Sequence, residues 1–573
     1  MPVHNTDVAR IFTEVADLLE IEGANDFRVR AYRDAAQTIG QLSRQVADLI
    51  EAGEDLTEMK GIGDDLAGKV ATIVNTGALP LLQDLEQRVT PALADLLHIE
   101  GLGPKRVRAL HNALGITTRD DLRQAAEHKR IREVKGFGET LEQNILDHID
   151  QGEEERTLWF HAEPMATSLA DYLAEHEAVA RVKVAGSFRR KKETVGDLDV
   201  LVLGPEGAGI MAHFVNYEDA DEVLSQGSTR SSVVLASGMH VDVRVIPEES
   251  FGAALLYFTG AKEHNIALRN RALDRDLTIN EYGVFTKADD ERVGGATEEA
   301  MYASLNLPYI VPELREQRGE IEAAAKGTLP DLIEKDDLRG NLHTHTTDSD
   351  GKASIDEMAQ AAIERGLDYL AITDHSSLVG VVQGLDADGL RAQVDRIRAL
   401  NDDLDDLTLL AGIEVDILKD GTLDLPDDVL ADLDVCIASV HTQFGLSEEQ
   451  QTERILRAMD HPHVHILGHP TGRRLGQRTA YAVNVHRLLE AADERGCAME
   501  LNAQPERLDL HDVYCKAAKE MGVPIVIGTD AHAPGALDYF RFGVAQARRG
   551  WLEANDVVNT RSWKEAKAVL ERA

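Results

Sequence analysis

Three aspartates in two predicted strands have the types and spacing that metal-dependent phosphate chemistry requires. Asp197 and Asp199 stand two residues apart at the start of an apolar run, so in a strand both side chains project from the same face. Asp242 lies in the alternating run 240–245, with valines on the opposite face. Adjacent ionised carboxylates repel each other, and a divalent cation such as Mg²⁺ or Mn²⁺ relieves that repulsion. For an isolated Asp-x-Asp, acids at a strand edge beside a turn would be the preferred interpretation.

The segment before these aspartates favours the metal interpretation. Residues 182–185, apolar except for Lys183, lead into the turn Gly186-Ser187, and a basic stretch follows at 189–192. A glycine-serine turn, a basic patch, an Asp-x-Asp and a later strand aspartate together indicate two-metal phosphoryl chemistry.

An aromatic pair downstream could contact a nucleotide. Tyr257 and Phe258 precede a break at Gly260, and Asn265 and Arg269 follow at helical spacing. Such pairs are more often part of a core, but beside a metal site they could stack on a sugar and base.

From residue 339 onward, apolar runs alternate with helical patterns, and most runs end in a side chain that can bind a metal. Chemistry at the C-terminal ends of alternating strands is typical of a TIM-type barrel. A mixed imidazole and carboxylate set suits Zn²⁺, Mn²⁺ or Fe²⁺, and it is too large for one ion. Two or three close metals indicate phosphate ester hydrolysis by a bridging hydroxide. The nine candidates are His343, His345, Asp350, His375, Glu414, His441, His469, Asp530 and His532.

Amphipathic patterns predict that the first 150 residues are helical, and three similar hairpins recur within them. Each has two glycines around an apolar residue and precedes a helical pattern. Backbone N–H groups at such a hairpin can bind phosphate without a basic side chain. Three copies about forty residues apart form an internal repeat, which resembles helix-hairpin-helix elements that grip a DNA backbone. The glycines are Gly61, Gly63, Gly101, Gly103, Gly136 and Gly138.

Lys69 follows the first hairpin by one helical turn. A solvated surface lysine is the default interpretation. The alternative is a Schiff-base nucleophile that attacks the sugar aldehyde of a damaged DNA site, which requires a lowered pKa.

Length and composition predict a soluble cytoplasmic protein of three to five domains. A chain of 573 residues exceeds one ordinary core. No run approaches a membrane span, and the N-terminus has no secretory pattern. Cys436, Cys497 and Cys515 are widely spaced, which predicts free thiols in a reducing compartment.

The net charge of −41 argues by itself against nucleic acid as a partner. The alternative is a salt-adapted proteome, in which acidic surfaces maintain solubility. We therefore interpret the charge as evidence about the environment, and we expect a loss of stability in dilute buffer.

The stretch from residue 1 to about 317 resembles the X family of DNA polymerases, the group of polymerase beta. The resemblance rests on Gly-Ser-Phe-Arg-Arg at 186–190, Gly-Asp-x-Asp-x-Leu at 196–201, Val-Asp-x-Arg at 241–244 and Tyr-Phe-Thr-Gly at 257–260. It implies that Asp197 and Asp199 bind both metals. Asp242 would complete the site that activates the primer 3′ hydroxyl.

The same resemblance implies the nucleotide contacts. The phosphates would be held by Gly186, Ser187, Arg190 and Gly196, and the sugar pocket would be lined by Tyr257, Phe258 and Gly260. Asn265 would contact the nucleotide, and Arg269 would touch the template strand. Lys69 matches the lyase nucleophile, although Asp65 replaces a basic residue of that pocket. His240 and Lys262 also depart from the family pattern.

The C-terminal half resembles the PHP (polymerase and histidinol phosphatase) domain. The matching motifs are His-x-His at 343–345, Thr-Asp-His at 373–375, Leu-Gly-His-Pro at 467–470 and Gly-Thr-Asp-Ala-His at 528–532. All nine ligand positions are filled, which implies an active hydrolase. The order of polymerase and then phosphoesterase resembles bacterial and archaeal X-family enzymes.

The expected architecture is multidomain. A helical lyase-like domain (1–85) and a helix-hairpin-helix subdomain (86–150) precede an α/β nucleotidyltransferase palm (151–248) and a nucleotide-selection subdomain (249–317). A linker (318–338) leads to a distorted (β/α)7 TIM-like PHP barrel (339–573).

The expected function is a monomeric polymerase that acts on gapped or primer-template DNA with deoxynucleoside triphosphates in repair. Its 3′–5′ exonuclease, 3′-phosphatase and abasic-site endonuclease activities would lie in the barrel. Two rivals are a histidinol-phosphate type phosphatase with a degenerate polymerase half and a non-catalytic scaffold that binds DNA ends.

Overall fold

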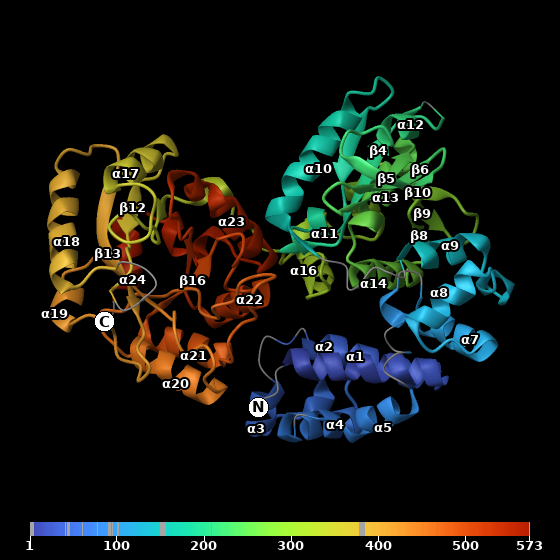
Figure 1. The fold of residues 1–573 in the computed structure, drawn as a ribbon, viewed down its shortest axis with the longest axis horizontal. Coiled ribbons are helices and arrows are strands. Elements are labelled where there is room, and N and C mark those ends of the chain that lie inside the picture. Colours follow the sequence, from blue (N-terminus) through green and yellow to red (C-terminus); the bar gives the residue numbers. More distant parts are fainter. Residues whose placement is uncertain are drawn as a thin grey trace. The chain divides into compact units, whose positions relative to one another are not determined.

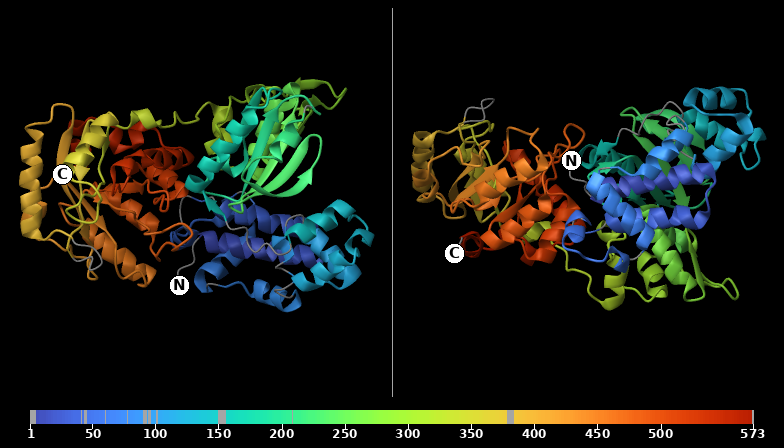
Figure 2. Two further views of the ribbon diagram at one scale, coloured as in Figure 1. Left: turned by 45° about the horizontal axis from the view of Figure 1, so that its top comes forward. Right: turned by 90° about the horizontal axis from the view of Figure 1, so that it is seen from below.

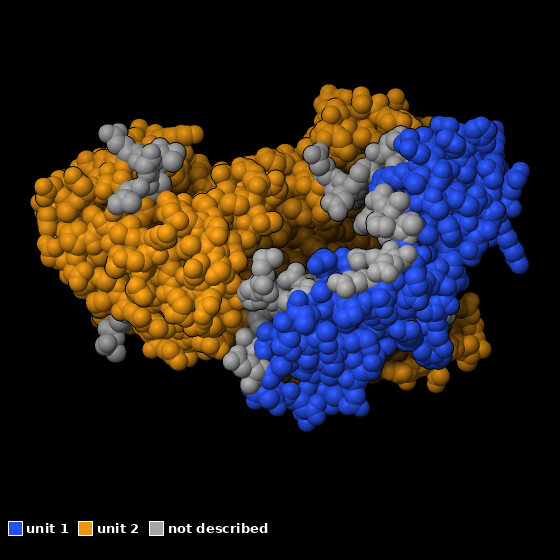
Figure 3. All heavy atoms as spheres, turned by 60° about the horizontal axis from the view of Figure 1, so that its bottom comes forward, with its two compact units in different colours: residues 1–155 blue, residues 156–573 orange. Residues whose placement is uncertain are grey.

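The chain forms two units, residues 1–155 and 156–573, which Figure 3 colours separately. The computed structural model describes residues 5–571, apart from 41, 43–45, 60, 77, 90–92, 94–95, 100–101, 149–155, 208 and 378–383. No helix among these residues is long and apolar enough to cross a membrane.

The first unit is all-helical, as the amphipathic spacing predicts. One hydrophobic cluster, from Val8 to Ile145, runs through it and joins the apolar faces of its helices. Local signals set helix ends: Pro104 begins α7, and Gly115 ends it with a left-handed φ of 70°. The helices are α1 (Asn5–Glu22), α2 (Asp26–Gly40), α3 (Val46–Glu51), α4 (Asp64–Thr76), α5 (Pro80–Arg88), α7 (Pro104–Leu114), α8 (Arg119–Glu127) and α9 (Glu139–His148).

The palm is a five-stranded sheet in the order β2-β4-β7-β6-β5, whose central pair β4 and β7 is parallel. Its strands are green in Figure 2, and β7 alternates buried valines with partly exposed polar residues. They are β2 (Arg181–Val184), β4 (Asp197–Leu203), β5 (Ala220–Gln226), β6 (Arg230–Leu235) and β7 (His240–Ile246). The palm helices are α10 (Trp159–Ala174), α11 (Gly186–Arg189) and α12 (Ile210–Phe214), and β1 (Thr157–Leu158) pairs with β3 (Thr194–Val195).

A smaller helical subdomain follows the palm, with a three-stranded sheet in the order β10-β9-β8. Its elements are α13 (Phe251–Thr259), α14 (Lys262–Leu273), β8 (Leu277–Asn280), β9 (Gly283–Thr286), β10 (Arg292–Gly294), α15 (Glu298–Ser304) and α16 (Glu320–Lys326). Helix α16 lies in the segment expected to be a linker. Ile321 and Ala324 pack into this subdomain's core, and buried Glu320 contacts buried His264, so the helix is part of the fold.

Seven parallel strands in consecutive order, β11 to β17, form the C-terminal barrel. A bridge between Thr344 and Ala531 joins the segments that follow its first and last strands, so the predicted barrel is confirmed and nearly closed. The strands are β11 (Gly340–Asn341), β12 (Tyr369–Ile372), β13 (Thr408–Asp416), β14 (Val435–Ser439), β15 (Ile466–Leu467), β16 (Ala498–Asn502) and β17 (Ile525–Gly528).

Alternate strand residues face the barrel interior and the surrounding helices. Tyr369 and Ala371 of β12 join the interior cluster, whereas Leu370 and Ile372 join the outer one. Figure 1 shows α17 and α18 beside β12 and β13. The helices are α17 (Ile355–Glu364), α18 (Ala387–Asn401), α19 (Asp427–Leu430), α20 (Glu448–Met459), α21 (Val485–Arg495), α22 (Asp512–Met521), α23 (Phe540–Arg549) and α24 (Trp563–Leu570).

The palm and the barrel share a hydrophobic cluster. Phe542 of α23 lies edge-on to Trp159 and Phe160 of α10, with each pair of ring centroids 5.4 Å apart. Leu508 of the barrel joins the same cluster. The cysteines Cys436, Cys497 and Cys515 are buried and form no disulfide with one another.

Candidate metal centres and nucleotide site

The palm aspartates lie side by side because β4 and β7 are parallel and in register. Asp199 is the direct Cα partner of Asp242, and Asp197 precedes Asp199 on the same face. Burial raises the pKa of Asp199 to about 7, and the charges of Asp197 and Asp242 contribute further. A carboxylate cluster with this mutual repulsion is chemically suited to bind a divalent cation.

Asp242 is held by polar neighbours. Arg230 Nη2 lies 2.7 Å and Arg244 Nη2 lies 3.2 Å from its Oδ2, and the Ser232 hydroxyl donates to its Oδ1. Among the described residues, the groups whose ligand atoms converge within 4.8 Å all lie in the barrel rather than here. Arg244 also lies over the Phe258 ring, 4.5 Å from its centroid, which brings the end of α13 beside the aspartates.

Gly186 must be a glycine for this site to form. Its φ is +62°, and a Cβ there would lie 3.1 Å from Asp199 Oδ2. Ser187 follows it in α11, and Gly196 directly precedes β4. The glycine-serine turn therefore passes close to the carboxylate pair.

Arg190 is fixed by two acceptors. Its Nε donates to Glu316 Oε1 over 3.0 Å, and its Nη1 donates to the Thr259 carbonyl. The left-handed Gly260, with φ +71°, permits this approach, since a Cβ there would lie 3.0 Å from Arg190 Nη1. No described residue bonds to Nη2 of Arg190.

Asn265 lies beside the aromatic pair that is predicted to line a sugar pocket, and one of its side-chain atoms lacks a hydrogen bond. Asn265 Nδ2 donates to the Tyr257 carbonyl over 2.8 Å, whereas its Oδ1 is buried without a partner. Arg269 lies 5.6 Å from the centroid of the Tyr257 ring. An unsatisfied buried acceptor is costly unless a ligand completes it.

The described residues of the three predicted hairpins follow one pattern. Each follows a short 3₁₀ turn and is anchored by a buried apolar residue (Ile62, Leu102 or Phe137), and a helix begins directly after its second glycine. The apolar N–H donates three residues back, over 3.1, 2.9 and 3.0 Å respectively. Gly61, Gly63, Gly103, Gly136 and Gly138 occupy the expected positions, and Gly101 lies outside the described residues.

Lys69 is paired rather than free. Its Nζ forms an ion pair with Asp65, one helical turn earlier, and lies 5.9 Å from the centroid of the Tyr32 ring. Its side chain is 20% exposed. The ion pair with Asp65 therefore occupies the nitrogen that a Schiff-base nucleophile would need.

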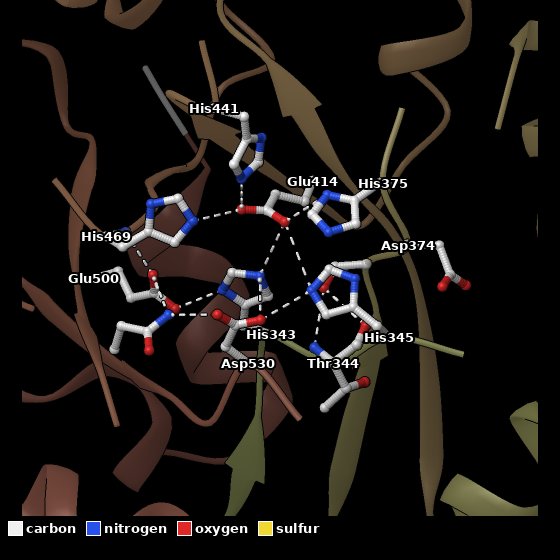
Figure 4. A network of polar contacts seen from close by, with 12 residues as sticks. His343, Thr344, His345, Asp374, His375, Glu414, His441, His469, Glu500 and Asp530 are labelled. Atoms are coloured by element: carbon white, nitrogen blue, oxygen red, sulfur yellow. Dashed lines mark hydrogen bonds and ion pairs between the residues drawn. The ribbon is translucent and has the colours of Figure 1, made fainter. Parts of the chain in front are cut away.

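The nine predicted barrel ligands meet at the C-terminal side of the strands, and Figure 4 labels all of them except Asp350 and His532. Glu414, at the end of β13, lies at the centre. His469 Nε2 is 2.9 Å and His441 Nε2 is 3.3 Å from its Oε1, and His375 Nδ1 is 3.0 Å from its Oε2. Figure 4 shows His343 and His345 between this carboxylate and Asp530.

Three groups of ligand atoms lie close enough to hold an ion each. They are His345, Asp350, His375 and His532; His343, His345 and Asp530; and His375, Glu414 and His441. Within each group all atoms are within 4.8 Å of one another. Two histidines belong to two groups each, so the ions would be neighbours, as in two-metal phosphoesterases.

Two further observations indicate that the nine barrel side chains are suited to bind metal ions. Buried imidazole nitrogens of His343, His345, His375 and His469 make no hydrogen bond, and the short contact of His375 Nδ1 with Glu414 lacks hydrogen-bond geometry. Burial alone would lower the pKa of His441, but Glu414 and Asp416 outweigh it and raise that pKa to about 10. A carboxylate field that favours an imidazolium also favours a bound metal cation.

The pKa of His345 is lowered, in contrast to that of His441. Burial, then the charges of His375 and His532, lowers its pKa to about 4. A neutral imidazole is the form that binds metal. His469 and Asp530 adopt left-handed φ values of 23° and 49°, and backbone strain of this kind concentrates at functional sites.

Three residues of this centre were not predicted from the sequence. Glu500 accepts from His343 Nδ1 over 2.6 Å and from the His469 N–H over 2.6 Å. Asp416 lies 2.7 Å from His441 Nδ1, so both carboxylates orient ligand imidazoles. Arg507 Nε lies 3.7 Å from Asp530 Oδ2. Glu500 and Asp416 interrupt apolar strand runs, which is the signal that could have identified them.

Four family models match separate parts of the chain. Residues 3–79 match a helix-hairpin-helix domain, and 93–151 match a SAM-like helix-hairpin-helix tandem. Residues 254–316 match the DNA polymerase beta thumb, and 341–504 match the PHP domain. These matches confirm the predicted helical N-terminal region and the PHP barrel.

Curated relatives match either the whole chain or its barrel. DNA polymerase/3′-5′ exonuclease PolX of Bacillus subtilis (strain 168) is 37% identical over 574 residues, which cover 100% of both chains. A probable phosphatase of Thermoanaerobacter sp. (strain X514) is 31% identical over 231 residues, 38% of this chain and 89% of its own. A probable phosphatase of Caldanaerobacter subterraneus is 32% identical over 203 residues, 34% of this chain and 75% of its own.

Proposed function

The chain belongs to the X family of DNA polymerases that carry a PHP domain, and from this premise we propose that it both extends and trims DNA 3′ ends. It is a DNA-directed DNA polymerase with a metal-dependent phosphoesterase. One observation carries the proposal. The chain matches PolX over its full length, its palm pairs Asp199 with Asp242 on adjacent strands, and its barrel has a complete set of metal-binding side chains. We assign the substrates as gapped or primer-template DNA and deoxynucleoside triphosphates, used in short-gap repair such as base excision repair.

In the palm, Asp197, Asp199 and Asp242 would hold Mg²⁺ or Mn²⁺, which neutralises phosphate charge during in-line transfer. Ser232 and Arg230 orient Asp242. Gly186, Ser187, Arg190 and Gly196 are assigned to the triphosphate. Tyr257, Phe258 and Gly260 are assigned to the sugar, Asn265 to the nucleotide and Arg269 to the template. The unpartnered Oδ1 of Asn265 supports its assignment.

In the barrel, the nine ligands would hold two or three ions of Zn²⁺, Mn²⁺ or Fe²⁺, which supply an activated water for phosphate ester hydrolysis. Glu500 and Asp416 keep His343 and His441 in fixed orientations by accepting from Nδ1. Arg507, beside Asp530, is placed to neutralise a phosphate of the scissile ester.

The proposed barrel substrates are DNA 3′ ends, in 3′–5′ exonuclease, 3′-phosphatase and abasic-site endonuclease reactions. The similarity of the barrel to probable phosphatases supports the phosphatase reaction. The hairpin glycines Gly61, Gly63, Gly101, Gly103, Gly136 and Gly138 are assigned to the DNA backbone. We propose a cytoplasmic monomer in which Lys69 is the candidate lyase nucleophile, a role that its ion pair with Asp65 opposes.

The test is to incubate the protein with a gapped primer-template and Mn²⁺ in high salt, with and without nucleotides. Extension with nucleotides and 3′ trimming without them are expected. A protein that neither extends nor trims DNA would refute the proposal, and hydrolysis of small phosphate esters alone would favour the phosphatase rival.

A further inference from the structure

The palm segment between Gly186 and Val195 is held by side chains of the barrel. Arg473, in the loop after β15, forms a two-pronged ion pair with Glu193, with Nη1–Oε1 at 3.2 Å and Nη2–Oε2 at 2.7 Å. Arg549, the last residue of α23, donates from Nη1 to the Arg190 carbonyl over 2.7 Å. The segment assigned to the triphosphate is therefore anchored by a second domain.

Arg549 contacts three groups at once. Besides the Arg190 carbonyl, its Nη1 lies 3.0 Å from Glu316 Oε1, and its Nη2 lies 2.8 Å from Asp512 Oδ2. The Arg549 side chain is 3% exposed and Asp512 is 2% exposed, so these contacts are almost fully removed from water. A guanidinium with several charge-assisted bonds in this setting is rigid and costly to replace.

Glu316 connects this arginine to the side chain of Arg190. The same oxygen, Oε1, accepts from Arg549 Nη1 and from Arg190 Nε, each over 3.0 Å. Burial would raise the pKa of Glu316, but Arg549, Arg190 and Lys192 outweigh it and lower that pKa to about 2. The carboxylate is thus held ionised between the two guanidinium groups.

One barrel side chain therefore fixes Arg190 at both ends, its carbonyl directly and its guanidinium through Glu316. We propose that Arg549 is a positioning residue of the polymerase reaction, so that the barrel completes the nucleotide site of the palm. This inference rests on the proposed function, because it takes Arg190 as the ligand of the nucleotide's outer phosphates. It assigns the barrel a role in nucleotide addition that is separate from its own hydrolytic centre.

The neighbouring Arg548 offers a matched control. It lies on the same helix and also joins the barrel to the preceding subdomain, through Glu313 over 2.9 Å and Glu334 over 2.6 Å. Its hydrogen bonds go to Glu313, Glu334 and the Ile333 carbonyl, and none of them reaches Arg190 or Glu316. Replacing Arg548 therefore removes two ion pairs from the same helix, one with the half-buried Glu313 and one with the exposed Glu334, without removing a bond to the nucleotide segment.

The experiment uses the full chain and measures extension of a gapped primer-template against nucleotide concentration. In Arg549→Met the KM for nucleotide is expected to rise about tenfold, with a smaller change in kcat, because a phosphate ligand loses its fixed position. Barrel trimming of the same DNA should stay within about twofold of the parent, which also reports that the variant is folded. Arg548→Met should keep the parent KM.

Two further variants keep the inference testable. Arg549→Lys, for use if Arg549→Met does not fold, retains the charge but cannot bond three groups, so an intermediate KM is expected. Glu316→Gln should also raise KM, and its effect should not add to that of Arg549→Met, since both act on Arg190.

An unchanged KM in a folded Arg549 variant overturns the inference, as does an equal rise in Arg548→Met, which would indicate general loosening of the domains. If the parent itself fails to extend DNA, the proposed function falls and the inference falls with it. If the parent extends DNA normally and a folded Arg549 variant keeps the parent KM, the inference is overturned and the proposed function stands.

Discussion

Replacing Asp199 by asparagine should stabilise the metal-free protein at alkaline pH while it abolishes nucleotide addition. Asp199 is held beside Asp197 and Asp242 in a largely buried position, and together these raise its pKa to about 7. Asparagine keeps the shape of the side chain but removes the charge, so it relieves both the desolvation and the repulsion.

The magnitude follows from the difference between the folded and unfolded pKa values. The ordinary value is 3.8, so folding takes up a proton between pH 3.8 and about 7. The stabilisation that this proton gives is complete below pH 3.8 and is lost as the pH rises through about 7. Each unit is worth about 1.4 kcal/mol, and with an allowance for solvent screening the loss amounts to about 2–4 kcal/mol.

The assay compares thermal unfolding of Asp199→Asn and the parent in EDTA from pH 4 to pH 8. The unfolding temperature of the variant should equal that of the parent near pH 4 and should be higher at pH 8. Excess Mg²⁺ should remove this difference. Asp221→Asn, at an exposed position on β5 of the same sheet, is the control and should show no such trend. A pH-independent difference, or a less stable Asp199→Asn at pH 8, would refute the reasoning.

Three other predictions concern the remaining sites. Arg507→Met should slow 3′ trimming about tenfold or more and leave extension intact, because a phosphate loses a guanidinium; equal trimming rates would contradict this. Glu500→Gln should weaken metal retention in the barrel about 10- to 100-fold, seen as metal content after dialysis, whereas parent-like content would show that Glu500 does not support His343. Borohydride should trap little covalent complex between the parent and abasic DNA, and it should trap more with Asp65→Ala, because Lys69 then loses its ion pair. Equal trapping by the two proteins would show that Lys69 is not the nucleophile.

The ligands of both centres could be predicted because each follows a strand with a clear apolar pattern. Asp197 and Asp199 alternate with apolar residues, and parallel pairing then places Asp242 beside them. The barrel ligands end consecutive parallel strands, so fold class alone brings His343 and Asp530 to one face, though 187 residues separate them in sequence.

Contacts that depend on packing between distant elements could not be predicted in this way. Glu500 stands out in the sequence as an acid within the apolar strand β16, but its partner His343 is known only from the packing. Arg549 has no pattern that points to Arg190, which lies 359 positions earlier. The charged, alanine-rich segment 318–338 predicts a linker, but the buried pair of Glu320 and His264 shows that α16 packs as part of the fold.

The most direct test of two separate metal centres compares Asp199→Ala, His343→Ala and the parent on one gapped primer-template with Mn²⁺. Primer extension and 3′ trimming are followed on the same labelled strand. We expect Asp199→Ala to lose extension and keep trimming, and His343→Ala to lose trimming and keep extension. Loss of both activities in either folded variant, or retention of both, would contradict the account.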